Sequence, residues 1–166
     1  MTMADKIAVM NLGVLQQYDT PRNIYEHPKN LFVAGFIGSP SMNFIECTLV
    51  EEDGRAYLDS GEFRIEVTEF RDLIAKEAPG NELILGVRPE HVIVGPHPST
   101  KYALQGKVYV VEPLGDQMIL NFKIGSFLVK AIVPPTFEAS VGDKLWLSLE
   151  REKLHIIDKK TGKVIM

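Results

Sequence analysis

Residues 83–94 read Leu83-Ile-Leu-Gly-Val-Arg-Pro-Glu-His-Val-Ile-Val94, an apolar strand, a polar turn and a second apolar strand. Residues 145–156 repeat the pattern as Leu145-Trp-Leu-Ser-Leu-Glu-Arg-Glu-Lys-Leu-His-Ile156. Every residue of the first segment aligns with the residue 62 positions later, and the apolar residues at 83, 85, 87, 92 and 94 coincide with apolar residues. Such self-similarity predicts two related β-modules; chance alternation of apolar residues is the alternative explanation.

The sequence around these segments, from Met42 onward, consists of short apolar runs separated by turn residues. Turn chemistry every 8–12 residues is typical of an all-β barrel or sandwich. Residues 68–77 are ambiguous and could form one helical turn. The predicted strands are 44–50, 56–58, 63–67, 83–87, 92–94, 104–111, 118–124, 127–133, 145–149, 154–157 and 164–165.

The first forty residues have a different sequence pattern, which predicts a hairpin and two short helices. Two short apolar runs, 6–10 and 14–18, flank an Asn-Leu-Gly turn and predict a hairpin. Thr20-Pro21 predicts a capped helix over 22–26, and a second short helix over 31–37 ends at Gly38. A lone hairpin is marginally stable in water, so 1–40 reads as the end of a domain whose body lies elsewhere, and 41–166 as a β-domain.

Composition excludes several classes of protein. With 45% hydrophobic residues and 24% charged residues, the chain is expected to bury a core rather than remain disordered. Its net charge of −4 argues against a nucleic-acid binder, which normally presents a basic face. The single cysteine, Cys47, can form no internal disulfide and is expected to be buried. There is no signal-peptide pattern and no apolar run of membrane-spanning length.

No motif for catalysis is present. The sequence lacks a Gly-x-x-x-x-Gly-Lys-Ser/Thr phosphate loop, a nucleophile elbow and a zinc-binding His-Glu-x-x-His helix. The four histidines, His27, His91, His97 and His155, are far apart in sequence and have no cysteine partners. The sequence therefore predicts no catalytic residue, no cofactor and no metal in this chain.

Three segments are specific enough to suggest a family: Phe32-Val-Ala-Gly-Phe-Ile-Gly-Ser-Pro-Ser-Met-Asn-Phe44, Gly86-Val-Arg-Pro-Glu-His91 and Val110-Val-Glu-Pro-Leu-Gly-Asp116. In this order and spacing they resemble the maltose/glycerol-3-phosphate-type sugar-importer ATPases of the ABC family. Residues 3–28 are similar to the end of that family's nucleotide-binding domain, and 154–162 to its closing hairpin. The resemblance extends over essentially the whole chain.

The resemblance implies an OB-like regulatory β-domain of the TOBE type, built as two intertwined five-stranded modules. In the family this region holds two ATP-binding subunits together and in some members receives a regulatory protein. The phosphate loop, signature sequence and catalytic glutamate lie upstream of the segment matched here, so the chain is expected to be a fragment that cannot hydrolyse ATP. ATP and Mg²⁺, the membrane permease subunits and a position at the inner face of the cell membrane are implied for the full-length subunit.

Two groups of residues are candidates for contacts. The candidates for a dimer or domain interface are Arg88, Glu90, His91, Glu112, Leu114, Gly115 and Asp116, and the first three are expected to make polar contacts there. The alternative is a strand exit at Arg88–His91 and a tight connection at 112–116. Packing on the nucleotide-binding domain is expected from Leu31, Phe32, Val33, Phe36 and Ile37, which would form an exposed apolar patch without it.

Other functions compete with this interpretation. A stand-alone OB-like module could bind a small oxyanion or a regulatory protein, although no Ser/Lys-rich loop marks an anion site. A single-strand nucleic-acid binder would need a basic groove with stacking aromatic residues, and the sequence shows no such stripe. Nucleic acid is therefore not expected as a partner.

Overall fold

The computed structural model describes residues 3–166; Met1 and Thr2, which belong to the predicted 1–40 region, lie outside the described residues. The elements in chain order are β1 (Ile7–Asn11), β2 (Val14–Asp19), α1 (Pro21–Glu26), α2 (Leu31–Phe36), β3 (Asn43–Glu52), β4 (Arg55–Asp59), β5 (Arg64–Glu66), η1 (Thr68–Phe70), α3 (Arg71–Glu77), β6 (Glu82–Val87), η2 (Pro89–His91), β7 (Val92–Gly95), β8 (Tyr102–Pro113), β9 (Met118–Ile124), β10 (Phe127–Val133), β11 (Lys144–Leu149) and β12 (Leu154–Asp158). The prediction of a mainly β fold is confirmed.

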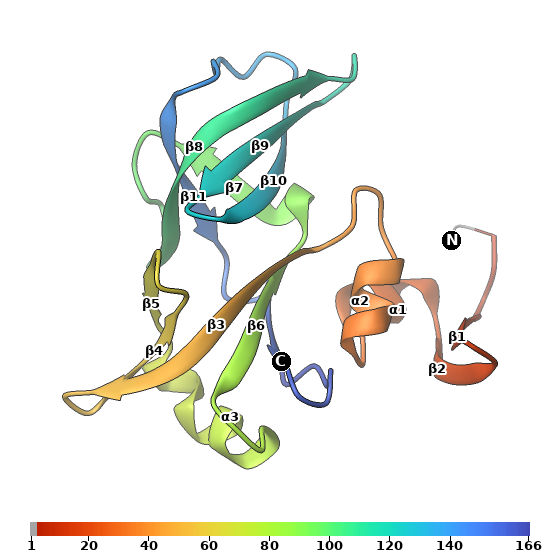
Figure 1. The fold of residues 1–166 in the computed structure, drawn as a ribbon. Helices are drawn as coiled ribbons and strands as arrows, with labels where there is room; N and C mark the ends of the chain where they lie inside the picture. Colours follow the sequence, from red (N-terminus) through yellow and green to blue (C-terminus); the bar gives the residue numbers. More distant parts are fainter. Residues whose placement is uncertain (1–2) are drawn as a thin grey trace.

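The N-terminal unit consists of the β1–β2 hairpin and the helices α1 and α2, which lie to one side of the two larger sheets (Figure 1). Leu12 and Gly13 have φ angles of 49° and 80°, the left-handed region that a two-residue hairpin turn of type I′ requires. Thr20 caps α1 by accepting a hydrogen bond from the Asn23 amide, as its sequence predicts, and Asn30 caps α2 in the same way.

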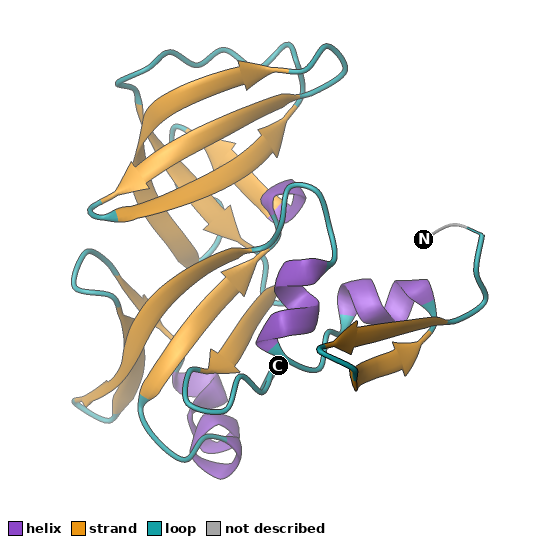
Figure 2. Ribbon diagram, turned by 45° about the vertical axis from the view of Figure 1, so that its right-hand side comes forward, coloured by secondary structure: helices purple, strands orange, loops and turns teal. Residues whose placement is uncertain are grey.

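Two five-stranded sheets follow, with strand orders β12-β6-β3-β4-β5 and β10-β9-β8-β11-β7. Each sheet contains a consecutive three-strand meander, a fourth strand beside it and an edge strand. The edge strands are exchanged: β7 follows β6 in sequence but joins the other sheet, and β12 follows β11 but joins the sheet of β6. The chain therefore forms two intertwined modules, which Figure 2 shows as two stacked groups of strands.

The pairing register reproduces the 62-residue repeat. Leu147 pairs with Val94 in one sheet, and their counterparts 62 positions away, Leu85 and Ile156, pair in the other. Ser148 with Ile93 and Gly86 with His155 obey the same rule. Because a one-residue slip would move every side chain to the opposite face, agreement at several positions reflects a shared architecture rather than chance alternation. The prediction of two related modules is confirmed.

One hydrophobic core spans both sheets, whereas the N-terminal unit has its own small cluster of Val9, Ile24, Val33 and Ile37. At the start of β3 the amide side chain of Asn43 joins the sheets, because it donates to the Lys130 carbonyl and accepts from the Lys130 amide, both at 2.8 Å. Cys47 is buried, as expected, and burial raises the pKa of its thiol to about 12.

Two local predictions are wrong. Residues 68–77 form η1 and α3 rather than a single turn, because Phe70 and Ile74, one helical turn apart, are both buried against the sheets. Residues 164–165 form only an isolated bridge between Val164 and Ile157. Among residues 3–166, no helix combines the length and the apolar character needed to cross a membrane.

Candidate regulatory junction

Arg88 lies at the contact between the N-terminal unit and the β-domain. It follows β6, where Pro89 begins the 3-10 turn η2, and its side chain is 1% exposed. Its Nη1 donates to the Ile37 carbonyl at 2.7 Å, while Nε and Nη2 donate to the Tyr25 carbonyl at 3.3 and 2.9 Å. One side chain of the β-domain thus binds the backbone at the ends of both N-terminal helices.

The charge of Arg88 is compensated by carbonyl oxygens and an aromatic ring. Its guanidinium lies 4.0 Å from the centroid of the Tyr25 ring, within the range of a cation–π interaction. Burial lowers the pKa of Arg88 to about 10, which still leaves it charged at neutral pH. Since a buried charge is costly unless it is hydrogen-bonded, the carbonyls of Tyr25 and Ile37 are essential to this arrangement.

Glu90 and His91 contact the same residue of α1. The Tyr25 hydroxyl donates to the Glu90 carboxylate, and the Tyr25 and His91 rings meet edge to face with centroids 6.2 Å apart. All three candidates from the Arg-Pro-Glu-His turn therefore meet Tyr25, a residue that the sequence did not single out. These contacts lie between the two parts of the chain, and the proposal that this turn serves a domain interface remains open to test.

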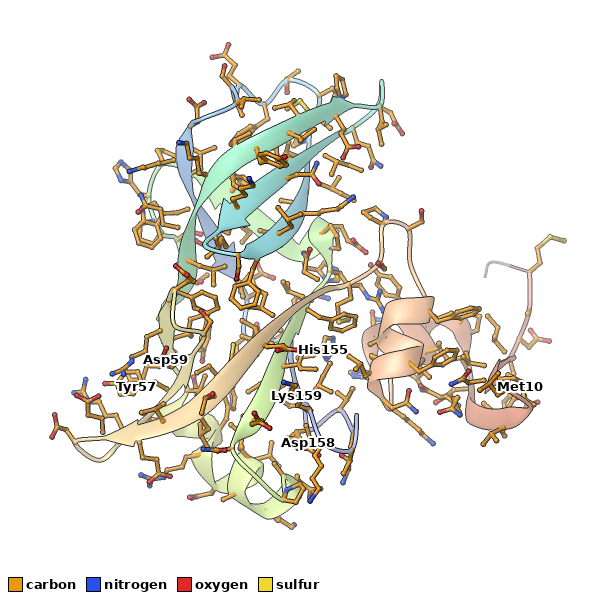
Figure 3. All side chains as sticks on the ribbon, viewed as in Figure 1. Met10, Tyr57, Asp59, His155, Asp158 and Lys159 are labelled. Atoms are coloured by element: carbon orange, nitrogen blue, oxygen red, sulfur yellow. The ribbon has the colours of Figure 1, made fainter. Side chains whose placement is uncertain are left out.

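A polar cavity of about 180 Å³ lies beside this contact. His27 from α1's end, His91 from η2 and His155 from β12 line it, together with Arg88. Figure 3 shows His155 on the side of the β-domain that faces the N-terminal helices. These three histidines are far apart in the sequence, and the fold brings them together. Among residues 3–166, no three His, Cys, Asp or Glu side chains are placed so that they could hold a metal ion together.

The two turns of the internal repeat meet at this cavity. Arg88 and His91 come from the first turn, and Glu152 and Lys153, from the second, complete the lining. Burial lowers the pKa of His155 to about 4, and the nearby charge of Arg88 acts in the same direction. The Nδ1 of His155 lies 3.2 Å from the Met166 carbonyl oxygen, to which its N–H donates. Burial also lowers the pKa of His91.

The C-terminal segment also contacts the N-terminal unit through backbone hydrogen bonds. The Leu31 amide donates to the Gly162 carbonyl at 2.7 Å, and the Val164 amide donates to the Lys29 carbonyl at 3.0 Å. The segment that follows β12 is thereby hydrogen-bonded to the stretch between α1 and α2. Movement of the N-terminal helices would have to break these bonds as well as those of Arg88.

The second candidate group lies at the tip of the β8–β9 hairpin. Glu112 accepts a hydrogen bond from the Asn121 side chain at 2.7 Å, which ties the two strands together. Leu114 is 53% exposed, Gly115 has a φ angle of 87°, and Asp116 is exposed. This tip is a tight strand connection, with contacts within its own hairpin rather than with the Arg88 turn. Its role as an interface is still a prediction.

The five apolar candidates of α2 differ in burial. Val33 and Ile37 are buried in the small N-terminal cluster, so the expectation that all five form an exposed patch in this chain is wrong for these two. Leu31 and Phe32 are half-buried. Phe36 is 65% exposed and stacks on Phe32 with ring centroids 5.5 Å apart. Val33 lies on the inner face of α2, and Ile37, which directly follows the helix in an extended conformation, packs in the same cluster.

Comparison with known proteins gives two family matches. Residues 38–92 match the MalK OB fold domain, and residues 85–157 match the TOBE domain. The trehalose/maltose import ATP-binding protein MalK of Thermococcus litoralis is 38% identical over 99% of this chain and 45% of its own length. The sn-glycerol-3-phosphate import ATP-binding protein UgpC of Burkholderia pseudomallei is 37% identical, over 98% and 44% respectively. The chain thus spans slightly less than half of these curated relatives.

The chain is also similar to a solved structure of another protein. It is the cytoplasmic molybdate-binding protein ModG, with a TM-score of 0.49 and 18% sequence identity over 69% of this chain and 94% of that chain. A similarity of this size does not support a shared ligand.

Proposed function

Because this chain belongs to the family of ATP-binding subunits of sugar-importing ABC transporters, through its MalK-type OB-fold domain and its TOBE domain, we propose that it is the regulatory and dimerisation region of such a subunit. Residues 1–40 would be the end of the nucleotide-binding domain, and 41–166 the regulatory domain. In this proposal ATP, Mg²⁺ and the permease subunits are engaged by the nucleotide-binding domain, at the inner face of the membrane. This region by itself would not hydrolyse ATP.

The observation that carries the proposal is the uneven distribution of exposed apolar side chains. Of the 14 large hydrophobic residues exposed among residues 3–166, seven lie before residue 40. They are Met3, Met10, Leu12, Val14, Leu15, Tyr18 and Phe36. Large exposed apolar surface marks an interaction site, and half of these exposed side chains belong to the N-terminal unit. A nucleotide-binding domain would cover it, and the Arg88 contacts would then transmit movements of that domain to the sheets.

The second copy of the subunit is proposed to dock on the outer side of β8–β10. Exposed apolar residues there include Val110, Leu114 and Leu128, close to the polar candidates Glu112 and Asp116. An apolar centre with a polar rim is the usual composition of a protein interface. A contact that persists while the nucleotide-binding domains separate would keep their effective concentration high. A regulatory protein is the further partner of this proposal.

Light scattering after size-exclusion chromatography tests the dimer, with the 166-residue chain at tens of micromolar. We expect a dimer for the wild type and a monomer for Leu114→Glu, because a carboxylate in an apolar interface is left without a partner. Val141→Glu, at a residue that is 66% exposed and outside β8–β10, should remain dimeric. A wild-type monomer at every concentration would contradict dimerisation through this region.

A further inference from the structure

Three lysines stand side by side on the sheet that contains β8. Lys144 on β11 pairs directly with Lys107 on β8, and Lys107 pairs directly with Lys123 on β9. All three are exposed, whereas Gly106 and Val108, the neighbours of Lys107 in β8, are buried. Because side chains alternate between the faces of a sheet, the three lysines form one row on its outer face.

This row is unfavourable for the isolated fold. Like charges directly opposite each other on neighbouring strands are destabilising. The salt bridges found among residues 3–166 use the other cations Arg22, Arg64, Arg71, Lys101, Arg151, Lys159 and Lys163. In the row itself, Lys123 lies 3.9 Å from the centroid of the Tyr109 ring, a contact that orients its ammonium without neutralising it. A chain of net charge −4 thus concentrates positive charge at one place.

The three lysines line a single cavity of about 220 Å³. Its other lining residues are Gln105, Gly106, Ile124 and Gly125, and Glu62 from the β4–β5 connection. The carboxyl carbon of Glu62 lies only 2.1 Å from where a Cβ at Gly125 would be, so only glycine permits this approach. Three lysine side chains and one carboxylate therefore line the cavity.

We propose that this lysine row is a binding site for the phosphate groups of a small soluble anion, such as a phosphorylated metabolite. Neighbouring strands are about 4.8 Å apart, so two flexible lysine side chains can donate to the same phosphate. Charge-assisted hydrogen bonds of this kind are about twice as strong as neutral ones. The bound anion would remove the repulsion between the lysines. The site lies outside the Arg88 junction, but it shares the outer face of the sheet with the proposed dimer surface, since Lys123 pairs directly with Leu128.

A single strand of nucleic acid fits the site less well. Such strands are held in a long basic groove with several aromatic side chains for base stacking. Here the cavity is short, and the ring of Tyr109 is already occupied by Lys123. The observations therefore favour a compact anion over a polymer.

Isothermal titration calorimetry with inorganic pyrophosphate at low ionic strength tests the proposal on the whole 166-residue chain. Lys107→Gln should weaken binding about 10-fold, the equivalent of one lost charge-assisted hydrogen bond. Glu62→Gln should strengthen it, because the carboxylate at the edge repels the ligand. Lys76→Gln, at an exposed position on α3, changes the net charge by the same amount as Lys107→Gln and should leave binding unchanged.

A second readout separates the site from a merely structural role. Without ligand, Lys107→Gln should raise the melting temperature, since it relieves repulsion. Pyrophosphate should then raise the melting temperature of the wild type by more than that of the variant. If Lys107→Gln does not fold, Lys144→Gln, at the first residue of β11, takes its place in both measurements. Equal weakening by Lys107→Gln and Lys76→Gln, absence of pyrophosphate binding, or tighter binding of a single-stranded oligonucleotide or of anionic vesicles would each overturn the proposal.

Discussion

The carbonyl oxygen of Tyr25 accepts two hydrogen bonds from Arg88, at 3.3 Å from Nε and 2.9 Å from Nη2, while the same guanidinium lies 4.0 Å from the centre of the Tyr25 ring. A planar guanidinium can make these contacts at once because its donors form a rigid fork and its face can stack. Lysine offers neither property. The position of the N-terminal helices on the β-domain therefore depends on the identity of this residue.

Replacing Arg88 should loosen the junction. In Arg88→Met the carbonyls of Tyr25 and Ile37 lose charged hydrogen-bond donors, while the cost of burying the charge is recovered. We expect a net loss of about 3 kcal/mol in the free energy of unfolding, measured by chemical denaturation. Protease should also cleave the connection around residues 38–41 faster. Arg55→Met, at an exposed position, is the control, and equal losses in the two variants would contradict this role for Arg88.

His155 should make stability depend on pH. Burial lowers its pKa from 6.5 to about 4, so the native state holds it neutral while the unfolded chain binds a proton at mildly acidic pH. Stability should therefore rise with pH from about 4 to 6.5 and be complete above 6.5. At about 1.4 kcal/mol per pH unit the contribution amounts to about 3 kcal/mol at most. The lowered pKa of His91 acts in the same direction.

The measurement is a series of denaturation curves across this pH range for the wild type and His155→Gln. Glutamine cannot titrate but can still donate to the Met166 carbonyl, so the variant should have a flatter pH dependence. His97→Gln, at an exposed histidine, should behave as the wild type. If the free energy of unfolding changes with pH as steeply in His155→Gln as in the wild type, other groups control stability at acidic pH.

The strands of the β-domain could largely be predicted from the sequence, because their signals are local. The predicted ranges 118–124 and 127–133 coincide with β9 and β10, where alternating apolar residues are bounded by a Gly-containing turn. The repeat between residues 83–94 and 145–156 indicated two modules, but the exchange of β7 and β12 between the sheets is non-local. Helix α3 was underestimated because its stability comes from burying Ile74 rather than from capping.

The contacts of the candidate site could be predicted only in part. The Arg-Pro-Glu-His turn was recognised, but its partner Tyr25 is 63 residues from Arg88, and nothing in its own neighbourhood marks it. The convergence of His27, His91 and His155 depends on the docking of α1 against two turns. The lysine row depends on the register of three strands, and a scan for a basic stripe along the sequence cannot detect charges brought together by cross-strand pairing.

Gly106 should be required for packing rather than for backbone conformation. A Cβ there would lie 3.0 Å from the Phe122 Cβ and 3.2 Å from a Leu147 methyl carbon. The Phe122 Cβ is fixed to its strand and cannot move aside, so Gly106→Ala should cost about 1–3 kcal/mol through overpacking. Gly80→Ala, where a Cβ would meet no atom within 4 Å, should be close to neutral. Equal unfolding free energies for the two variants would show that a Cβ at position 106 is accommodated without overpacking.

Val33 and Phe36 of α2 differ in burial, so their substitution should have different consequences. Val33 is completely buried, so Val33→Ala should lower the free energy of unfolding by about 1–2 kcal/mol, as for the loss of core methyl groups. Phe36, 65% exposed, contributes little beyond its stacking on Phe32, so Phe36→Ser should change stability by less than about 0.5 kcal/mol.

Phe36→Ser should instead act on association. If the exposed apolar residues of the N-terminal unit pack on a nucleotide-binding domain, the Phe36 ring is part of that contact. Loss of the ring should then weaken the contact. The measurement is the ATPase activity and subunit stability of the full-length protein carrying Phe36→Ser, with Leu73→Ser, at an exposed residue of α3, as the control. A full-length Phe36→Ser protein as stable and active as the Leu73→Ser protein would mean that this ring faces solvent in the complete subunit, and that the nucleotide-binding domain packs elsewhere.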